Sequence, residues 1–128
     1  FHLAIPVSNL KNAQMFYTNT LGCIVGRSSK EWLDLNFFGH QLVLHLSKNK
    51  LNTNSNNVDN KKIQIPHFGI ILEWNDWTKL SKKLNNKIDF IIKPHIRFKD
   101  NIGEQATMFF TPATCAVVML IIAEATWA

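Results

Sequence analysis

The sequence contains one pattern twice, and this repeat restricts the fold more than any other feature. A histidine stands at the head of an apolar, strand-like run, and a helical stretch and further strand-like runs follow it. His2 begins the first copy and His67, 65 residues later, begins the second. The same offset carries Met15, in the first helical stretch, onto Leu80 in the second. Each copy predicts a βαβββ unit, and neither is large enough to bury its apolar faces without the other.

The pattern of apolar residues and turn formers predicts the boundaries of the elements. In the first copy we expect strands at 1–7, 23–28, 31–37 and 41–46, and a helix that is capped by Ser8 or Asn9 and stops at Gly22. In the second we expect strands within 63–72 and at 88–92, 96–99, 105–110 and 116–122, and a helix capped by Asn75 or Asp76. Residues 48–62 are polar and aperiodic, which predicts a loop. The prediction is one α+β domain with module one at 1–47, a linker at 48–62 and module two at 63–128.

Composition excludes several classes of protein. The net charge is +5, but the positive residues are mostly scattered lysines, whereas a nucleic-acid footprint gathers on one face. No apolar run approaches the roughly 18 residues that a membrane span needs. The N-terminus shows no secretory signal pattern, and Cys23 and Cys115 are too far apart in sequence to suggest a disulfide framework. We therefore expect a cytoplasmic protein that binds neither nucleic acid nor membranes.

Several local motifs resemble one family. They are the stretches at 1–7 (FHLAIPV), 26–29 (GRSS), 37–41 (FFGHQ) and 103–110 (GEQATMFF), together with Phe16-Tyr17 and Leu21-Gly22-Cys23 in and after the first helical stretch. Together with the paired βαβββ pattern, they are similar to the vicinal oxygen chelate superfamily. That superfamily includes glyoxalase I, type-I extradiol dioxygenases and bleomycin-resistance proteins. The closest resemblance is to a bacterial subgroup of predicted extradiol-type dioxygenases, and it covers about residues 1 to 112.

The resemblance implies a metal centre. In this superfamily the two modules' curved sheets face a shared cleft, and the first and last strands of each module supply ligands to a divalent metal. Carried over by position, the first-strand ligands are His2 and His67, and His45 falls near the last-strand position of module one. The implied metal is Fe(II) first, with Mn, Ni or Zn as alternatives. The implied partners are a small catechol-like or other vicinal-oxygen substrate and a second copy in a homodimer.

The family's fourth ligand is missing from the sequence. The last strand of module two usually carries a Glu a few residues after a Pro, but here Val118 or Met119 occupies that position after Pro112. A two-His-one-carboxylate iron site requires that carboxylate. His45, Glu104 or Glu124 could complete the set, and Glu104 is also the candidate catalytic residue.

Two other functions stay open. One is a metal-free binding or resistance protein, like the bleomycin-resistance proteins. The other is a glyoxalase-type lyase or isomerase that uses nickel or zinc. For the remaining candidates the expectation is structural: His40 and His95 in loops, Arg97 at the surface, and Trp77 in the core or at an interface.

Overall fold

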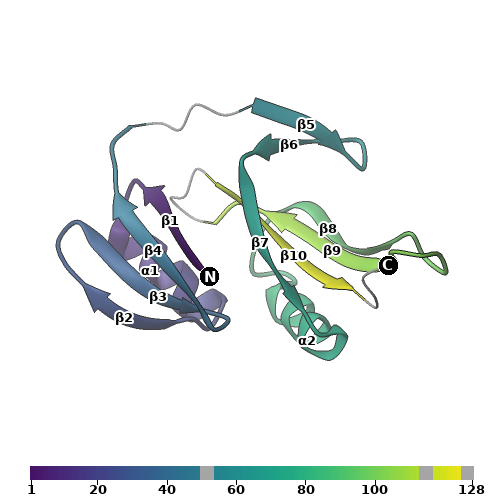
Figure 1. The fold of residues 1–128 in the computed structure, drawn as a ribbon, viewed down its shortest axis with the longest axis horizontal. Coiled ribbons are helices and arrows are strands. Elements are labelled where there is room, and N and C mark those ends of the chain that lie inside the picture. The colour runs from purple at the N-terminus through teal and green to yellow at the C-terminus, as the bar shows by residue number, and fades with distance from the viewer. Residues whose placement is uncertain (50–53, 113–116, 125–128) are drawn as a thin grey trace. The chain divides into compact units, whose positions relative to one another are not determined.

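The structure is a computed structural model that describes residues 1–49, 54–112 and 117–124. The chain forms two compact units, Phe1–Thr53 with Pro112–Val117 and Asn54–Thr111 with Val118–Ala128. Each unit contains one four-stranded mixed sheet and helical segments, which confirms the predicted α+β class (Figure 1).

The first unit contains β1 (His2–Val7), α1 (Leu10–Met15), a π-helical turn (Phe16–Thr20), β2 (Ile24–Ser28), β3 (Trp32–Phe37) and β4 (His40–Leu46). The second contains β5 (Asn54–Val58), β6 (Lys61–Ile65), β7 (His67–Leu72), α2 (Trp74–Leu84), β8 (Phe90–Arg97), β9 (Gln105–Phe110) and β10 (Val118–Glu124).

The two four-stranded sheets have the same strand order, as the sequence repeat predicts. Sheet one runs β1-β4-β3-β2 and sheet two runs β7-β10-β9-β8. In each, the first and last strands of the repeat are parallel neighbours, and the other pairs are antiparallel. His2 pairs with Gln41 in sheet one, and His67 pairs with Val118 in sheet two. The two histidines therefore hold equivalent positions within their own sheets.

In the first unit, one face of the sheet packs against the helical segment and forms a core. Leu33, Leu35, Leu42 and Leu44 are buried on the side of α1, together with Ala13 and Tyr17 of the helical segment. The helix begins after Asn9, whose side chain accepts a hydrogen bond from Asn12 N at 2.9 Å, as predicted. The helical segment ends before Gly22, where φ is +79°, a conformation that favours glycine.

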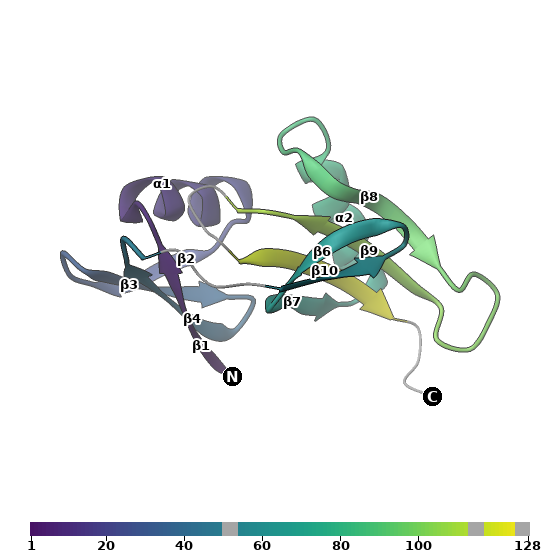
Figure 2. The same ribbon diagram turned by 90° about the horizontal axis from the view of Figure 1, so that it is seen from above.

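In the second unit, α2 lies against sheet two (Figure 2). Its buried side chains there include Trp77, Leu80 and Leu84. The indole Nε1 of Trp77 donates to the carbonyl of Ile121 at 3.2 Å, which fixes the helix to β10. The cap differs from the prediction, because Glu73 precedes the helix and Asn75 lies inside it. None of the helices in the described ranges is long and apolar enough to cross a membrane.

The prediction of a loop over residues 48–62 is wrong from residue 54 onward. Residues 54–65 form the β5–β6 hairpin, which turns at Asp59 and Asn60, both with positive φ. The hairpin strands show no alternation of apolar and polar residues in the sequence. Nearly all of their side chains face solvent, and only Ile63 is fully buried. The expected break between two strands at 88–99 is also wrong, because β8 continues through Pro94 as one strand.

Candidate functional site

His2 opens β1 on the face of sheet one that points away from Leu42 and Leu44, and a neighbour in the adjacent strand holds its ring. Its Nδ1 lies 2.7 Å from Oε1 of Gln41, which is also its register partner in β4. An amide oxygen only accepts, so Nδ1 carries the proton in this bond. The neutral ring then has a lone pair on Nε2, the form in which imidazole binds a metal.

His67 opens β7 in the second unit and shows the same arrangement with a different partner. Its Nδ1 lies 2.9 Å from the carbonyl oxygen of Gln64, at the end of the hairpin. The half-buried ring also packs edge-on against Phe109, with centroids 5.6 Å apart. A carbonyl can only accept, so in the neutral ring the lone pair again lies on Nε2.

His45 lies on the same face of sheet one as His2 but farther along the strands. It pairs with Pro6, whereas His2 pairs with Gln41. The four residues from Gln41 to His45 correspond to roughly 13 Å along a strand. Metal–imidazole bonds are about 2.1 Å long. A metal ion bound to the His2 ring would therefore lie too far along the strands for the His45 ring to bind it as well. Its role as a third ligand stays a prediction.

No carboxylate takes the place of the expected Glu in the described part of the second unit. Val118, across from His67, is 3% exposed and belongs to an apolar cluster with Ile63, Ile92 and Phe109. Glu104 accepts a hydrogen bond from Asp100 N at 2.7 Å and so closes the β8–β9 loop.

Glu124 also lies away from this position. It lies at the opposite end of β10 from Val118, across from Gln105, roughly 20 Å along the strand. Neither unit, over its described residues, gathers three His, Cys, Asp or Glu side chains around one point.

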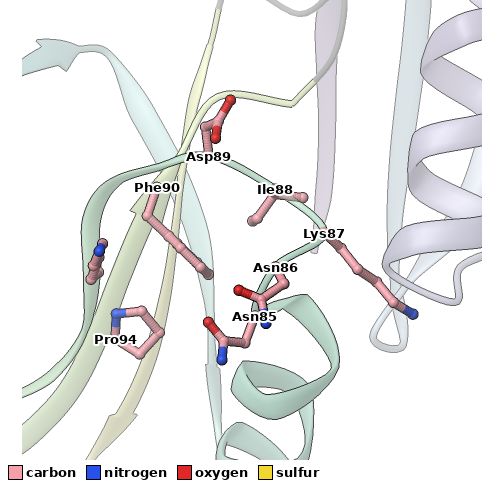
Figure 3. Close-up of a pocket in the computed structure, with 8 residues that line it drawn as sticks. Asn85, Asn86, Lys87, Ile88, Asp89, Phe90 and Pro94 are labelled. Carbon is pink, nitrogen blue, oxygen red and sulfur yellow. The ribbon is translucent and has the colours of Figure 1, made fainter.

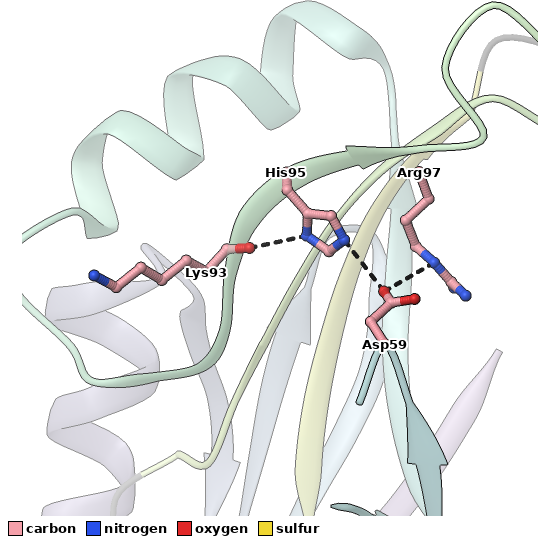
Figure 4. A network of polar contacts seen from close by, with 4 residues as sticks. All are labelled: Asp59, Lys93, His95 and Arg97. Atoms are coloured by element: carbon pink, nitrogen blue, oxygen red, sulfur yellow. Dashed lines mark hydrogen bonds and ion pairs between the residues drawn. The ribbon is translucent and has the colours of Figure 1, made fainter. Parts of the chain in front are cut away.

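The remaining candidates have other partners. His95 is in β8 rather than a loop, and Arg97 follows it on the same side of the strand. Both contact Asp59 at the hairpin turn, at 3.2 Å from His95 Nε2 and 3.0 Å from Arg97 Nε (Figure 4). His95 Nδ1 faces the carbonyl of Lys93 at 3.0 Å, so acceptors engage both ring nitrogens. Sequence reasoning missed Asp59, although an Asp-Asn pair is a common turn signal.

Each unit has a surface hollow of its own. One hollow in the first unit, about 380 Å³, is lined by Gly26, Arg27, Asp34, Leu35, Asn36, Gly39, His40 and Gln41. Arg27 contributes its guanidinium, which is paired with Asp34 at 3.2 Å. The hollow in the second unit, about 440 Å³, follows α2 and is lined by residues 85–90 with Lys93 and Pro94 (Figure 3). Gln41 links the first hollow to His2, whereas the second contains none of the predicted site residues.

Comparison with solved structures finds proteins that share this fold. A glyoxalase/bleomycin resistance protein/dioxygenase from Alicyclobacillus acidocaldarius is 30% identical, with a TM-score of 0.80, and the match covers 98% of this chain and 91% of that one. The chain therefore belongs to the glyoxalase/bleomycin resistance/dioxygenase group of the vicinal oxygen chelate superfamily.

More distant structures share the fold. An integron cassette protein from the Halifax Harbour sewage outfall metagenome is 22% identical, with a TM-score of 0.69 and coverage of 96% of each chain. A fosfomycin resistance protein from Listeria monocytogenes is 9% identical, with a TM-score of 0.68 and coverage of 96% of this chain and 90% of that one. No family model matches the chain, and no curated protein does.

Proposed function

We propose that this protein binds a small molecule with vicinal oxygens, and that His2 and His67 are ligands of the divalent metal ion involved. The observation that carries the proposal is the matched state of the two rings. Each is the first residue of its sheet's first strand, and each has Nδ1 engaged by an oxygen acceptor, Gln41 Oε1 or Gln64 O. Metal-binding histidines in proteins are commonly oriented by such a bond.

The donor type favours particular ions. Neutral imidazole suits Zn, Ni, Cu and Fe(II), whereas Mn prefers oxygen ligands. A bound ion would polarise the oxygens of a chelating ligand, and two protein ligands leave positions for them. The chain's own contribution is to hold both rings in the metal-binding tautomer through Gln41 and Gln64.

The residues do not fit the iron centre of an extradiol dioxygenase. That centre needs a carboxylate beside two histidines, and the position across from His67 is Val118 in an apolar cluster. We therefore expect no oxygen uptake with a panel of catechols and Fe(II). Dioxygen consumption matched to ring cleavage by the unaltered chain would show that a carboxylate comes from elsewhere and would restore the dioxygenase as the better proposal.

Metal binding is tested by titrating the apo-protein with Zn²⁺ or Ni²⁺ and measuring bound metal by mass spectrometry. His2→Ala and His67→Ala are each expected to lower the affinity by about tenfold or more. His95→Ala is the matched control, because acceptors occupy both of its ring nitrogens, and it should bind as the wild type does. His45→Ala tests the predicted third ligand: an unchanged affinity would support the register argument, and a loss of affinity would identify His45 as a ligand.

The opposite result would favour a metal-free binding protein. The double variant His2→Ala/His67→Ala could take up as much metal as the wild type. That result would exclude these two histidines as ligands. The Val118→Glu variant supplies a further check, because a carboxylate across from His67 should raise Fe(II) affinity about tenfold, and Val118→Gln should not.

A further inference from the structure

The hollow that follows α2 is lined by Phe90, whose side chain lies on the face of sheet two opposite to His67. Phe90 of β8 pairs with Phe110 of β9, and Phe110 pairs in turn with Met119 of β10. His67 pairs with Val118, the residue before Met119, and successive residues of a strand point to opposite faces of a sheet. A ligand against Phe90 is therefore separate from a metal ion at the histidines.

The apolar part of this hollow is already fixed in position. Phe90 and Pro94 are half-buried in β8. The Phe90 ring packs against Phe110 in a T-shaped arrangement, with centroids 6.2 Å apart and planes at 82°. Because these side chains are held by their own packing, a ligand does not have to order them when it binds.

Two carboxamide side chains stand beside the Phe90 ring. Asn85 ends α2, and Asn86 follows it with a φ of 65°. Both are exposed, and within the described ranges neither amide has a hydrogen-bond partner. Figure 3 shows them next to Phe90, whereas Lys87 and Asp89 point away from it. The amides are neutral, and each offers two donor hydrogens and one acceptor oxygen.

The charges around the hollow favour neither an anion nor a cation. Lys87 and Lys93 are positive and Asp89 is negative, and all three are exposed to solvent, which screens them. The C-terminal end of α2 adds a partial negative charge. Because these charges nearly cancel, the lining suits a neutral ligand that both donates and accepts hydrogen bonds.

We propose that this hollow binds a neutral saccharide, with a pyranose ring against Phe90 and Pro94 and its hydroxyls at Asn85 and Asn86. A hydroxyl donates and accepts as a carboxamide does, so two adjacent amides match hydroxyls on adjacent carbons. A pyranose with equatorial hydroxyls presents axial C–H groups on its faces, and these hydrogens favour the negative face of an aromatic ring. The volume, about 440 Å³, is within the range of small-molecule sites.

The probe is methyl β-D-glucopyranoside, titrated into the full chain without added metal and followed in two-dimensional proton–nitrogen NMR spectra. A ligand of this size at an exposed site should bind with a Kd of about 1–10 mM. The shifts should saturate and lie within residues 85–94 and the side-chain amides of Asn85 and Asn86. Sorbitol has the hydroxyls without the ring and should bind about fivefold more weakly or worse.

Variants test the amides and the ring separately. Asn86→Gly removes one amide at a position where glycine accepts the positive φ, and it should raise the Kd about fivefold. Asn60→Gly is the matched control, because Asn60 has a φ of 64° at the turn of the β5–β6 hairpin, and it should leave the Kd unchanged. Phe90→Leu stays apolar but lacks the flat ring, and it should also raise the Kd about fivefold. Thermal unfolding checks that each variant is folded.

The double variant His2→Ala/His67→Ala keeps this test independent of the proposed metal site, and it should bind the glucoside as the wild type does. Weaker binding would place the saccharide at the histidines and overturn the proposal.

Three other results would also overturn it. Equal Kd values for Asn86→Gly and Asn60→Gly would exclude the amide as a partner of the saccharide. An unchanged Kd in Phe90→Leu, or equal binding of sorbitol and the glucoside, would exclude stacking on the ring. Shifts that do not saturate, or that lie outside residues 85–94, would exclude the hollow as the site.

Discussion

Replacing Gly69 by Ala tests the pairing that places His67 beside Val118. Gly69 lies in β7 opposite Leu120 of β10, two residues after His67. A Cβ at this position would overlap the carbonyl oxygen of Leu120 and lie 2.7 Å from its carbon, where 3.0 Å is already too close for real Cβ contacts. These are backbone atoms, so the clash can be relieved only if the strands separate.

The expected cost follows from that separation. An opening of roughly 1 Å or more takes ladder N···O distances of about 2.9 Å out of hydrogen-bonding range. The loss of about three such bonds, at ~1 kcal/mol each, predicts a fall of ~3 kcal/mol in the free energy of unfolding. That is a large part of the roughly 5–15 kcal/mol that domains usually have.

Urea unfolding, followed by tryptophan fluorescence, measures this free energy. Gly26→Ala is the matched control, since it is also a strand glycine outside the left-handed region, and its Cβ would meet Asp34 Cβ at an ordinary 3.4 Å. It should change stability by less than about 1 kcal/mol. A Gly69→Ala protein that is also within about 1 kcal/mol of the wild type would refute the register between β7 and β10.

Three further outcomes are expected. Leu84→Ala, at a fully buried position of α2, should lower the free energy of unfolding by about 2–5 kcal/mol in the same urea assay, whereas Lys83→Ala on the exposed face should have little effect. Trp77→Phe removes the indole bond to Ile121 and should cost about 1–2 kcal/mol, and a thermal midpoint equal to wild type would show that this bond contributes nothing. Gln41→Leu should lower Zn²⁺ affinity about tenfold by releasing the His2 ring without changing stability, so an unaltered titration would count against the orienting bond.

The spacing of apolar residues in the sequence predicted those helices and strands that bury one whole side against the core. The core face of α2 was readable in this way, since Trp77, Leu80 and Leu84 recur at helical spacing and are buried. The alternation in 41–46 likewise placed Leu42 and Leu44 in the core and His45 on the other side. The β5–β6 hairpin could not be read, because one buried residue, Ile63, leaves no period in a polar segment. Its strands depend on pairing with each other and on packing against sheet two.

The sequence by itself determined the repeat, the α+β class and the equivalent places of His2 and His67, because these depend on patterns along each strand and helix. It also showed that the usual Glu is absent. Only the tertiary structure decided which side chains meet across strands: Gln41 beside His2, Gln64 beside His67, and Val118 in an apolar cluster under the hairpin. Register between strands distant in sequence sets these contacts, and a shift of a single residue would turn each side chain to the other face of its sheet.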